Sequence, residues 1–156
     1  MLFFEETIAL RTNKVITISQ IWNSLWQKVE QPKLFTPTII KHQNQNIENE
    51  KTIRRELDFG SHKIYDLITF EFQKWINFEI IPNNDLHASG SLKILIIANN
   101  ENPNSYSLKF VYNLKGTHQS ANDDANYVEY LKSAYHQADL DCVKVIRNLV
   151  LNKKKK

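Results

Sequence analysis

The sequence predicts an α+β protein in which a curved, antiparallel, seven-stranded sheet wraps around a long C-terminal helix. Residues 38–117 form apolar and polar runs that resemble consecutive strands, and only short polar gaps separate them. The chain after Asp124 instead keeps apolar residues at helical spacing for about 28 residues. Because an amphipathic helix and a one-sided sheet must each bury an apolar face, we expect them to pack together.

Length and composition fit one folded domain. The chain has 156 residues, of which 42% are hydrophobic and 24% are charged, so composition argues against wholesale disorder. No run approaches the roughly 20 apolar residues of a membrane-spanning helix, so we expect no integral membrane association. We expect a single domain over residues 1–152, followed by a disordered lysine tail over residues 153–156.

The charge and the cysteine content argue against nucleic-acid binding, secretion, an internal disulfide and a thiol zinc site. Four positive charges belong to residues 153–156, so the net charge of +3 becomes −1 without them, and we expect no nucleic-acid partner. The N-terminus carries Glu5 and Glu6 in place of a basic segment, which argues against a signal peptide and favours a cytoplasmic location. The single cysteine, Cys142, excludes an internal disulfide and a thiol zinc site, and we expect it to pack as a small hydrophobe.

The N-terminal part predicts a strand and then one or two short helices. Residues 2–12 are rich in β-formers. A helix begins near Thr17, where Thr17 or Ser19 can cap it and Gln20 can complete a capping box. Pro32 ends the helix, and a short turn follows.

Six further strands are predicted. Their ranges are 38–45, 51–59, 62–72, 75–82, 89–98 and 105–116. The gaps between them are too short for the crossovers that parallel strands need, so the strands form an antiparallel meander.

The last predicted element is the long helix. Asn122, Asp123 and Asp124 suit its start, and basic residues suit its end. Its apolar stripe consists of Val128, Leu131, Ala134 or Tyr135, Ala138, Cys142, Val145, Ile146 and Leu149. We expect this stripe to face the concave side of the sheet and to leave an apolar cavity wherever sheet and helix do not touch.

Three stretches resemble a known family. They are "TISQIWNSL" leading to "PKLFTP", then "RRELDFGSH", then "YVEYLKSAYHQADLDCVKVIRNL" at residues 127–149. They are similar to the AtaL-like family of the SRPBCC superfamily, which includes START and birch-pollen-allergen-type proteins, and the resemblance covers nearly the whole chain. It implies the helix-grip fold and a hydrophobic cavity for small lipophilic molecules. It implies no particular catalytic residue, because carriers, receptors and aromatase/cyclases of the superfamily share no catalytic motif.

A two-residue turn at Gly60–Ser61 predicts the register of one hairpin. It pairs Phe59 with His62 and therefore places Arg55 opposite Asp66 on an apolar face. Other residues of that face are Ile53, Leu57, Ile64, Ile68 and Phe70. Because buried charges must be paired, two interpretations follow: Arg55 and Asp66 anchor a polar group of a ligand, or they form a bridge that only stabilises the fold.

The next turn leaves two registers open. A tight turn at residues 73–74 turns inward the set Trp75, Asn77, Glu79 and Ile81. A turn one residue longer instead buries Ile76, Phe78 and Ile80. Only the first register brings Glu79 to the cavity. Glu6 is a second candidate for a carboxylate that faces the cavity, because it is in line with apolar residues of the first strand.

Aromatic residues with polar tips mark the strand over residues 105–116. One face carries Tyr106, Leu108, Phe110, Tyr112 and Leu114, which either line a pocket or simply form core. The residues that we expect to bind a ligand are Arg55, Asp66, Leu57, Phe70, Leu108, Phe110, Tyr112, Leu131 and Tyr135.

Motifs for metals and cofactors are missing from the sequence. His136, Asp139 and Asp141 lie close together on the last helix, but we expect them to be solvated and expect no metal site. The sequence has no G-x-S-x-G elbow, no phosphate loop and no dinucleotide fingerprint, so we expect no cofactor.

These observations predict a protein that binds a small lipophilic molecule, more a binder than an enzyme. One alternative is a cofactor-independent cyclase, hydrolase or isomerase that acts on a lipophilic or polyketide-like metabolite. It requires a carboxylate with a raised pKa, which Asp66 beside Arg55 does not offer, so Glu79 or Glu6 would have to be the base. The other is an interaction module without a ligand that dimerises through outer apolar residues of the 75–82 strand, including Phe78; monomer and homodimer both stay open.

Overall fold

The computed structural model describes residues 2–46, 51–82, 90–99, 102–114 and 125–152. Its elements are β1 (Leu2–Ala9), α1 (Ile18–Glu30), the 3₁₀ helix η1 (Pro32–Leu34), β2 (Lys41–Asn46), β3 (Thr52–Asp58), β4 (Lys63–Glu71), β5 (Trp75–Ile81), β6 (Gly90–Asn99), β7 (Asn102–Leu114) and α2 (Ala125–Asn152). The predicted fold class is confirmed, with strand boundaries shifted by a few residues. The predicted helix cap at Asn122–Asp124 and the lysine tail lie outside the described residues.

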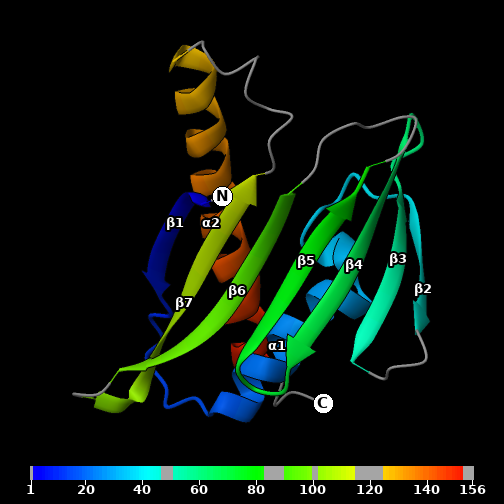
Figure 1. The fold of residues 1–156 in the computed structure, drawn as a ribbon. Coiled ribbons are helices and arrows are strands. Elements are labelled where there is room, and N and C mark those ends of the chain that lie inside the picture. The colour runs from blue at the N-terminus through cyan, green and yellow to red at the C-terminus, as the bar shows by residue number, and fades with distance from the viewer. Residues whose placement is uncertain (1, 47–50, 83–89, 100–101, 115–124, 153–156) are drawn as a thin grey trace.

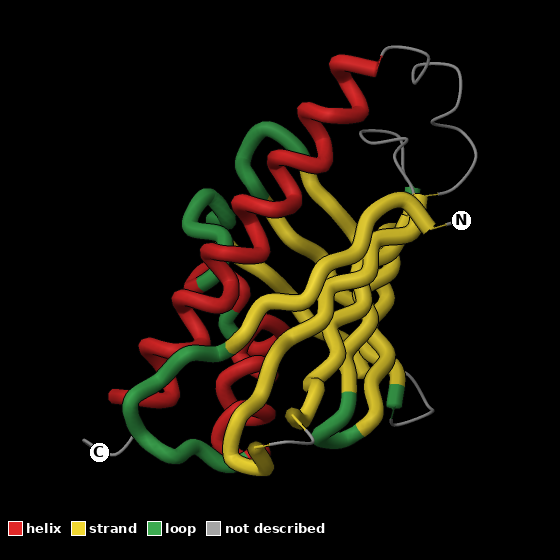
Figure 2. Tube along the Cα trace, turned by 90° about the vertical axis from the view of Figure 1, so that its left-hand side faces the viewer, coloured by secondary structure: helices red, strands yellow, loops and turns green. Residues whose placement is uncertain are grey.

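One antiparallel sheet contains all seven strands, in the order β1-β7-β6-β5-β4-β3-β2 (Figure 1). Strands β2 to β7 form the predicted meander, and β1 joins its far edge beside β7. Both helices cover the same face of the sheet (Figure 2), and α2 packs against α1 and β1. The space between this face and the two helices therefore holds the core. Within the described residues, neither helix combines the length and the apolar character needed to cross a bilayer.

The start of α1 agrees with the sequence prediction. Thr17 is the N-cap: its side chain accepts a hydrogen bond from the Gln20 backbone, and the Gln20 side chain accepts one from the Thr17 backbone. This capping box stabilises the helix start by about 1 kcal/mol. The face of α1 that meets the sheet consists of Ile21, Trp22, Leu25 and Val29, all buried.

The register of the β3–β4 hairpin is also confirmed. The backbone N–H of Phe59 donates to the carbonyl of His62, and Arg55 lies opposite Asp66. The turn residue Gly60 has a φ of +90°, which favours glycine because that conformation is strained for side chains with a Cβ.

The β4–β5 hairpin adopts the longer of the two registers left open. Residues 72–74 connect Glu71 to Trp75, and Gln73 takes a φ of +62°. Phe78 is therefore buried on the inner face, and the alternative that turns Glu79 inward is wrong. The apolar set is the one buried because burying Asn77 and Glu79 would cost their hydration. An outward dimer contact through Phe78 is wrong for the same reason.

The stripe on α2 differs from the predicted one. Ala134 and Ala138 are exposed, whereas Asp139 is only 1% exposed. The buried positions of α2 are Asp139, Cys142, Val143, Ile146 and Val150. The expectation that Asp139 is solvated is therefore wrong. The physical reason is that β1 and β7 supply polar partners for this carboxyl group, so that a charged residue type can occupy the inner face.

Candidate functional site

A pocket of about 310 Å³ lies on the face of the sheet that the helices cover. Strands β3 to β7 and both helices contribute to its wall. The apolar part of the wall consists of Leu57, Ile64, Phe78, Ile80, Leu92 and Leu114. The ionisable side chains at the wall are Lys28, Arg55, Asp66, Tyr112 and Tyr135.

Arg55 and Asp66 form a buried, two-pronged ion pair. Arg55 Nε donates to Asp66 Oδ1 at 3.1 Å, and Nη2 donates to Oδ2 at 2.7 Å. Both side chains are about 5% exposed. A third donor, Nη1, bonds the carbonyl of Lys28 at 2.8 Å, in the last turn of α1. The pair thus docks α1 on the sheet and also forms part of the pocket wall, so the two interpretations of the pair are compatible.

Positive charge gathers around Phe78. The Lys28 ammonium lies 5.8 Å from the Phe78 ring centroid and 5.1 Å from that of Phe35. The Arg55 guanidinium carbon lies 5.4 Å from the Phe78 centroid. Because Asp66 neutralises Arg55, Lys28 is the cation on this wall that favours a ligand with an electron-rich or negatively charged oxygen.

A second polar group lies behind the tyrosines. The Tyr112 hydroxyl donates to Asp139 Oδ1, and Glu6 lies close enough to Asp139 to raise the pKa of its carboxyl group. His136 Nδ1 lies 2.7 Å from Glu6 Oε1. Burial, together with the neighbouring Glu6, raises the pKa of Asp139 to about 8, and the Tyr112 hydrogen bond and the charge of Lys28 offset part of this rise.

Tyr112 and Tyr135 form the wall between this group and the pocket. Their rings stack with centroids 4.0 Å apart and an interplanar angle of 8°. Burial raises the pKa of both tyrosines above the ordinary value, and the bond to Asp139 raises that of Tyr112 further. Both hydroxyls are therefore neutral at physiological pH and can form hydrogen bonds as donors or acceptors.

Five of the nine residues predicted to bind a ligand line the pocket: Arg55, Leu57, Asp66, Tyr112 and Tyr135. The other four lie elsewhere. Leu108 and Phe110 are in the hydrophobic core, Phe70 packs on the rings of Trp22 and Trp26, and Leu131 is half-buried on α2. The ligand-binding role of all nine stays a prediction.

Sequence reasoning missed Lys28 and Asp139. Lys28 lies one residue before the buried Val29, and the other charged residue of the helix is Glu30. Nothing in this pattern indicated that the Lys28 side chain reaches the pocket. Asp139 had a usable signal, because it lies four residues after Tyr135 and three before Cys142, in line with the apolar stripe. A charged residue at a stripe position indicates a buried, partnered carboxyl group. Glu6, held as a candidate from its strand position, does reach this group, with 17% of its side chain exposed.

Among the described residues, the cysteine and the metal-ligating side chains give no further site. Burial raises the pKa of the Cys142 thiol to about 11, as expected for a packing residue. In the part of the chain that the structure describes, no three His, Cys, Asp or Glu side chains gather to hold a metal ion.

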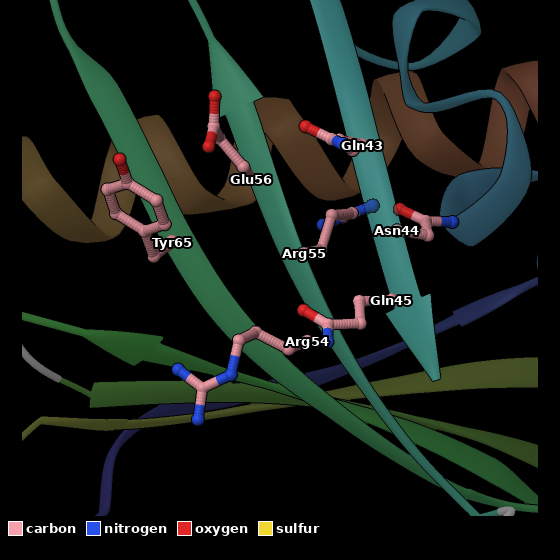
Figure 3. A pocket seen from close by; sticks show the side chains of 7 residues that line it. All are labelled: Gln43, Asn44, Gln45, Arg54, Arg55, Glu56 and Tyr65. Atoms are coloured by element: carbon pink, nitrogen blue, oxygen red, sulfur yellow. The ribbon is translucent and has the colours of Figure 1, made fainter. Parts of the chain in front are cut away.

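A separate groove of about 320 Å³ crosses β2, β3 and β4. Figure 3 shows that it is bordered by polar side chains, among them Gln43, Arg54, Glu56 and Tyr65. These four alternate with the inward residues of their strands, so they belong to the sheet face away from the helices. The groove shares Arg55 with the pocket, but its other lining residues differ from those of the pocket and are polar.

The fold and the covered pocket define a helix-grip protein, and comparisons with known proteins agree. The StfQ aromatase/cyclase of the steffimycin pathway superimposes with a TM-score of 0.67 at 8% identity over 98% of this chain, and the chain spans about half (51%) of that two-domain protein. The Zhui aromatase/cyclase from Streptomyces sp. R1128 gives 0.61 at 11% identity, covering 96% of this chain and 93% of Zhui. A point mutant of Thalictrum flavum norcoclaurine synthase gives 0.59 at 16% identity, covering 97% and 93%.

The particular family follows from the sequence. A family model described as acetylaranotin biosynthesis cluster protein L, AtaL, matches residues 7–153, so the chain belongs to the AtaL family. The resemblance seen in the sequence is confirmed. Comparison with curated protein sequences gives no match.

The raised pKa of Asp139 predicts an unusual dependence of stability on pH. The folded-state pKa of about 8 exceeds the ordinary value of 3.8, so the carboxyl group contributes stability below pH 3.8 that is lost progressively as the pH rises from there to 8. We expect Asp139→Asn to change the free energy of unfolding little at low pH. At high pH, where the wild-type group ionises, the variant is expected to be the more stable by roughly 2–4 kcal/mol.

Urea denaturation at a series of pH values measures this difference. Asp141→Asn is the matched control, because Asp141 is an exposed carboxylate on the same helix. A difference between wild type and Asp139→Asn that does not vary with pH would contradict the account.

Proposed function

We propose that this chain binds a small, largely apolar molecule bearing one polar oxygen in the pocket between the sheet and the two helices. The observation that carries the proposal is the composition of the wall: six apolar side chains surround a few ionisable ones. Ligand sites in proteins usually combine an apolar wall with a small number of placed polar groups, and span roughly 300 to 1,000 Å³. A volume of about 310 Å³ therefore fits a compact ligand, such as one with two or three fused rings.

The polar groups of the wall give the ligand an orientation. Lys28 and Arg55 hold positive charge beside Phe78, so a carboxylate, phenolate or carbonyl oxygen of the ligand is expected to lie on that side. The apolar body then contacts Leu92, Ile80 and Leu114. Asp66 already neutralises Arg55, which leaves Lys28 as the cation that a ligand anion meets.

Filling the pocket tests this proposal. We expect Ile80→Trp to place an indole in the pocket and to weaken binding of the probe 1-anilinonaphthalene-8-sulfonate by about tenfold or more, since the space for its rings is lost. The control is Ile97→Trp, at a β6 position that is 38% exposed, and it is expected to leave the probe affinity unchanged. Probe fluorescence gives both affinities, and circular dichroism checks that the variants fold.

Equal affinities for wild type and both variants would place the probe elsewhere and contradict the proposal. Native mass spectrometry of the freshly purified protein, followed by denaturing extraction, identifies any copurified ligand. A reproducible lipophilic adduct that Ile80→Trp loses and Ile97→Trp keeps is the expected result.

A second candidate function is a cofactor-independent cyclase or isomerase. The specific observation in its favour is that a pocket-wall hydroxyl, that of Tyr112, bonds directly to a carboxyl group whose pKa is about 8. Such a group exchanges protons near neutral pH, as acid–base chemistry requires. The aromatase/cyclases StfQ and Zhui share the fold, but their identities of 8% and 11% are too low to carry their activity over to this chain.

Proton exchange on a model substrate tests this candidate. In D₂O the α-hydrogens of 1-phenylbutane-1,3-dione exchange when a base removes one and a deuteron returns to the same carbon. We expect wild-type protein to accelerate this exchange saturably, and the acceleration to increase as Asp139 loses its proton near pH 8. Tyr112→Phe, which removes only the hydroxyl group, is expected to abolish it. An acceleration that is absent, or equal in Tyr112→Phe, would exclude this route.

A further inference from the structure

Two buried carboxyl oxygens have no donor in the hydrogen-bond network. They are Glu6 Oε2 and Asp139 Oδ2, and each is shielded from solvent. The other oxygen of each group is occupied, Glu6 Oε1 by His136 and Asp139 Oδ1 by the Tyr112 hydroxyl. The two carboxyl groups are nevertheless neighbours, since Glu6 raises the pKa of Asp139.

Two ionised carboxylates cannot hydrogen-bond to each other, because a carboxylate only accepts. They would also leave two negative charges adjacent in a site where Asp139 is 1% exposed. A proton placed between Oε2 and Oδ2 removes both difficulties, since one group then donates and the other accepts. Glu6 Oε2 and Asp139 Oδ2 are the oxygens of the two groups that no other donor occupies, so they are the ones available to this proton.

We propose that Glu6 and Asp139 share one proton, and that Tyr112, Asp139, Glu6 and His136 form a hydrogen-bonded path from the pocket wall to solvent. The path begins at Tyr112, which lines the pocket, and ends at His136, whose side chain is 53% exposed. It joins three elements: β7 supplies Tyr112, β1 supplies Glu6, and α2 supplies the other two residues.

The surroundings of the pair are compatible with one retained proton. Lys28 of α1 is the cation whose charge favours ionisation of Asp139. The other titratable groups beside Asp139 are Tyr112, Tyr135 and the thiol of Cys142. They are neutral and add no charge. The positive groups near the pair are Lys28 and, when protonated, the His136 ring 2.7 Å from Glu6 Oε1, and a net charge of −1 on the pair needs only one of them.

The shared proton also fixes the hydrogen bond that the pocket wall offers. Tyr112 gives its hydrogen to Asp139 Oδ1, so its oxygen can only accept a hydrogen bond from a ligand. Resting on the proposed function, this adds a second requirement to the ligand class: a hydroxyl or N–H group beside Tyr112, in addition to the oxygen that meets Lys28.

Carbon-13 NMR of the side-chain carboxyl groups tests the shared proton in the ligand-free protein, so its outcome does not depend on whether the pocket binds anything. In wild type we expect the pair to keep one proton up to about pH 8. Glu6→Gln replaces one acid by a neutral amide that can donate to Asp139. It is expected to lower the Asp139 midpoint by about one pH unit or more. The control Asp141→Asn is expected to leave the midpoint unchanged.

Two results would overturn the shared proton: ionisation of both carboxyl groups at pH 7 in wild type, or an Asp139 midpoint unaffected by Glu6→Gln. If Glu6→Gln does not fold, the infrared carbonyl band of a protonated carboxyl group in wild type at pH 7 decides, since its absence refutes the proposal.

The solvent end of the path has its own test. His136→Phe removes the exposed ring nitrogen and is expected to slow exchange of the Tyr112 hydroxyl proton with water several-fold, as seen in its NMR line width. Gln137→Ala, at the next exposed position of α2, is the control. Unchanged exchange in His136→Phe would refute the path to solvent and leave the shared proton standing on the carboxyl titration alone.

Discussion

The hydrogen bond from Arg55 to the last turn of α1 is the interaction on which the pocket depends. A buried guanidinium must have partners, and here Asp66 takes two of its donors while the Lys28 carbonyl takes a third. Asn44 adds a bond to the neighbouring carbonyl of Val29 at 3.2 Å. The end of α1 is thereby fixed over β2 and β3, while α2 packs against β1, so the pocket wall draws on both helices.

The pocket wall therefore carries two polar groups, one basic and one acidic. Lys28 and Arg55 supply positive charge, and Tyr112 leads to the acid pair of Asp139 and Glu6. Each is stabilised by a partner within the fold, so neither needs a ligand to be tolerated there. A ligand that contacts both groups is oriented along one direction in the pocket, which suits selective binding and equally suits acid–base chemistry on a carbonyl compound.

Local rules in the sequence predicted much of this arrangement. The two-residue turn at Gly60–Ser61 and the alternation of its strands were enough to pair Arg55 with Asp66. They could not decide the β4–β5 register, because turn length there depends on Gln73 adopting a positive φ. Nor could they place Asp139 inside, since its partners Tyr112 and Glu6 lie 27 and more than 130 residues away and only the packed fold brings them together. The shared face of β7 likewise did not distinguish Tyr112, at the pocket, from Leu108 and Phe110, which are in the core.

Chemical-shift mapping tests the central claim, that the covered pocket is the ligand site, most directly. Amide NMR spectra of the uniformly labelled protein are recorded while 1-anilinonaphthalene-8-sulfonate is added. The account predicts saturable shifts at Leu57, Ile80, Leu92 and Tyr135, which line the pocket from four different elements. Shifts confined to the outer groove around Arg54 and Tyr65 (Figure 3), or no shifts at all, would contradict it.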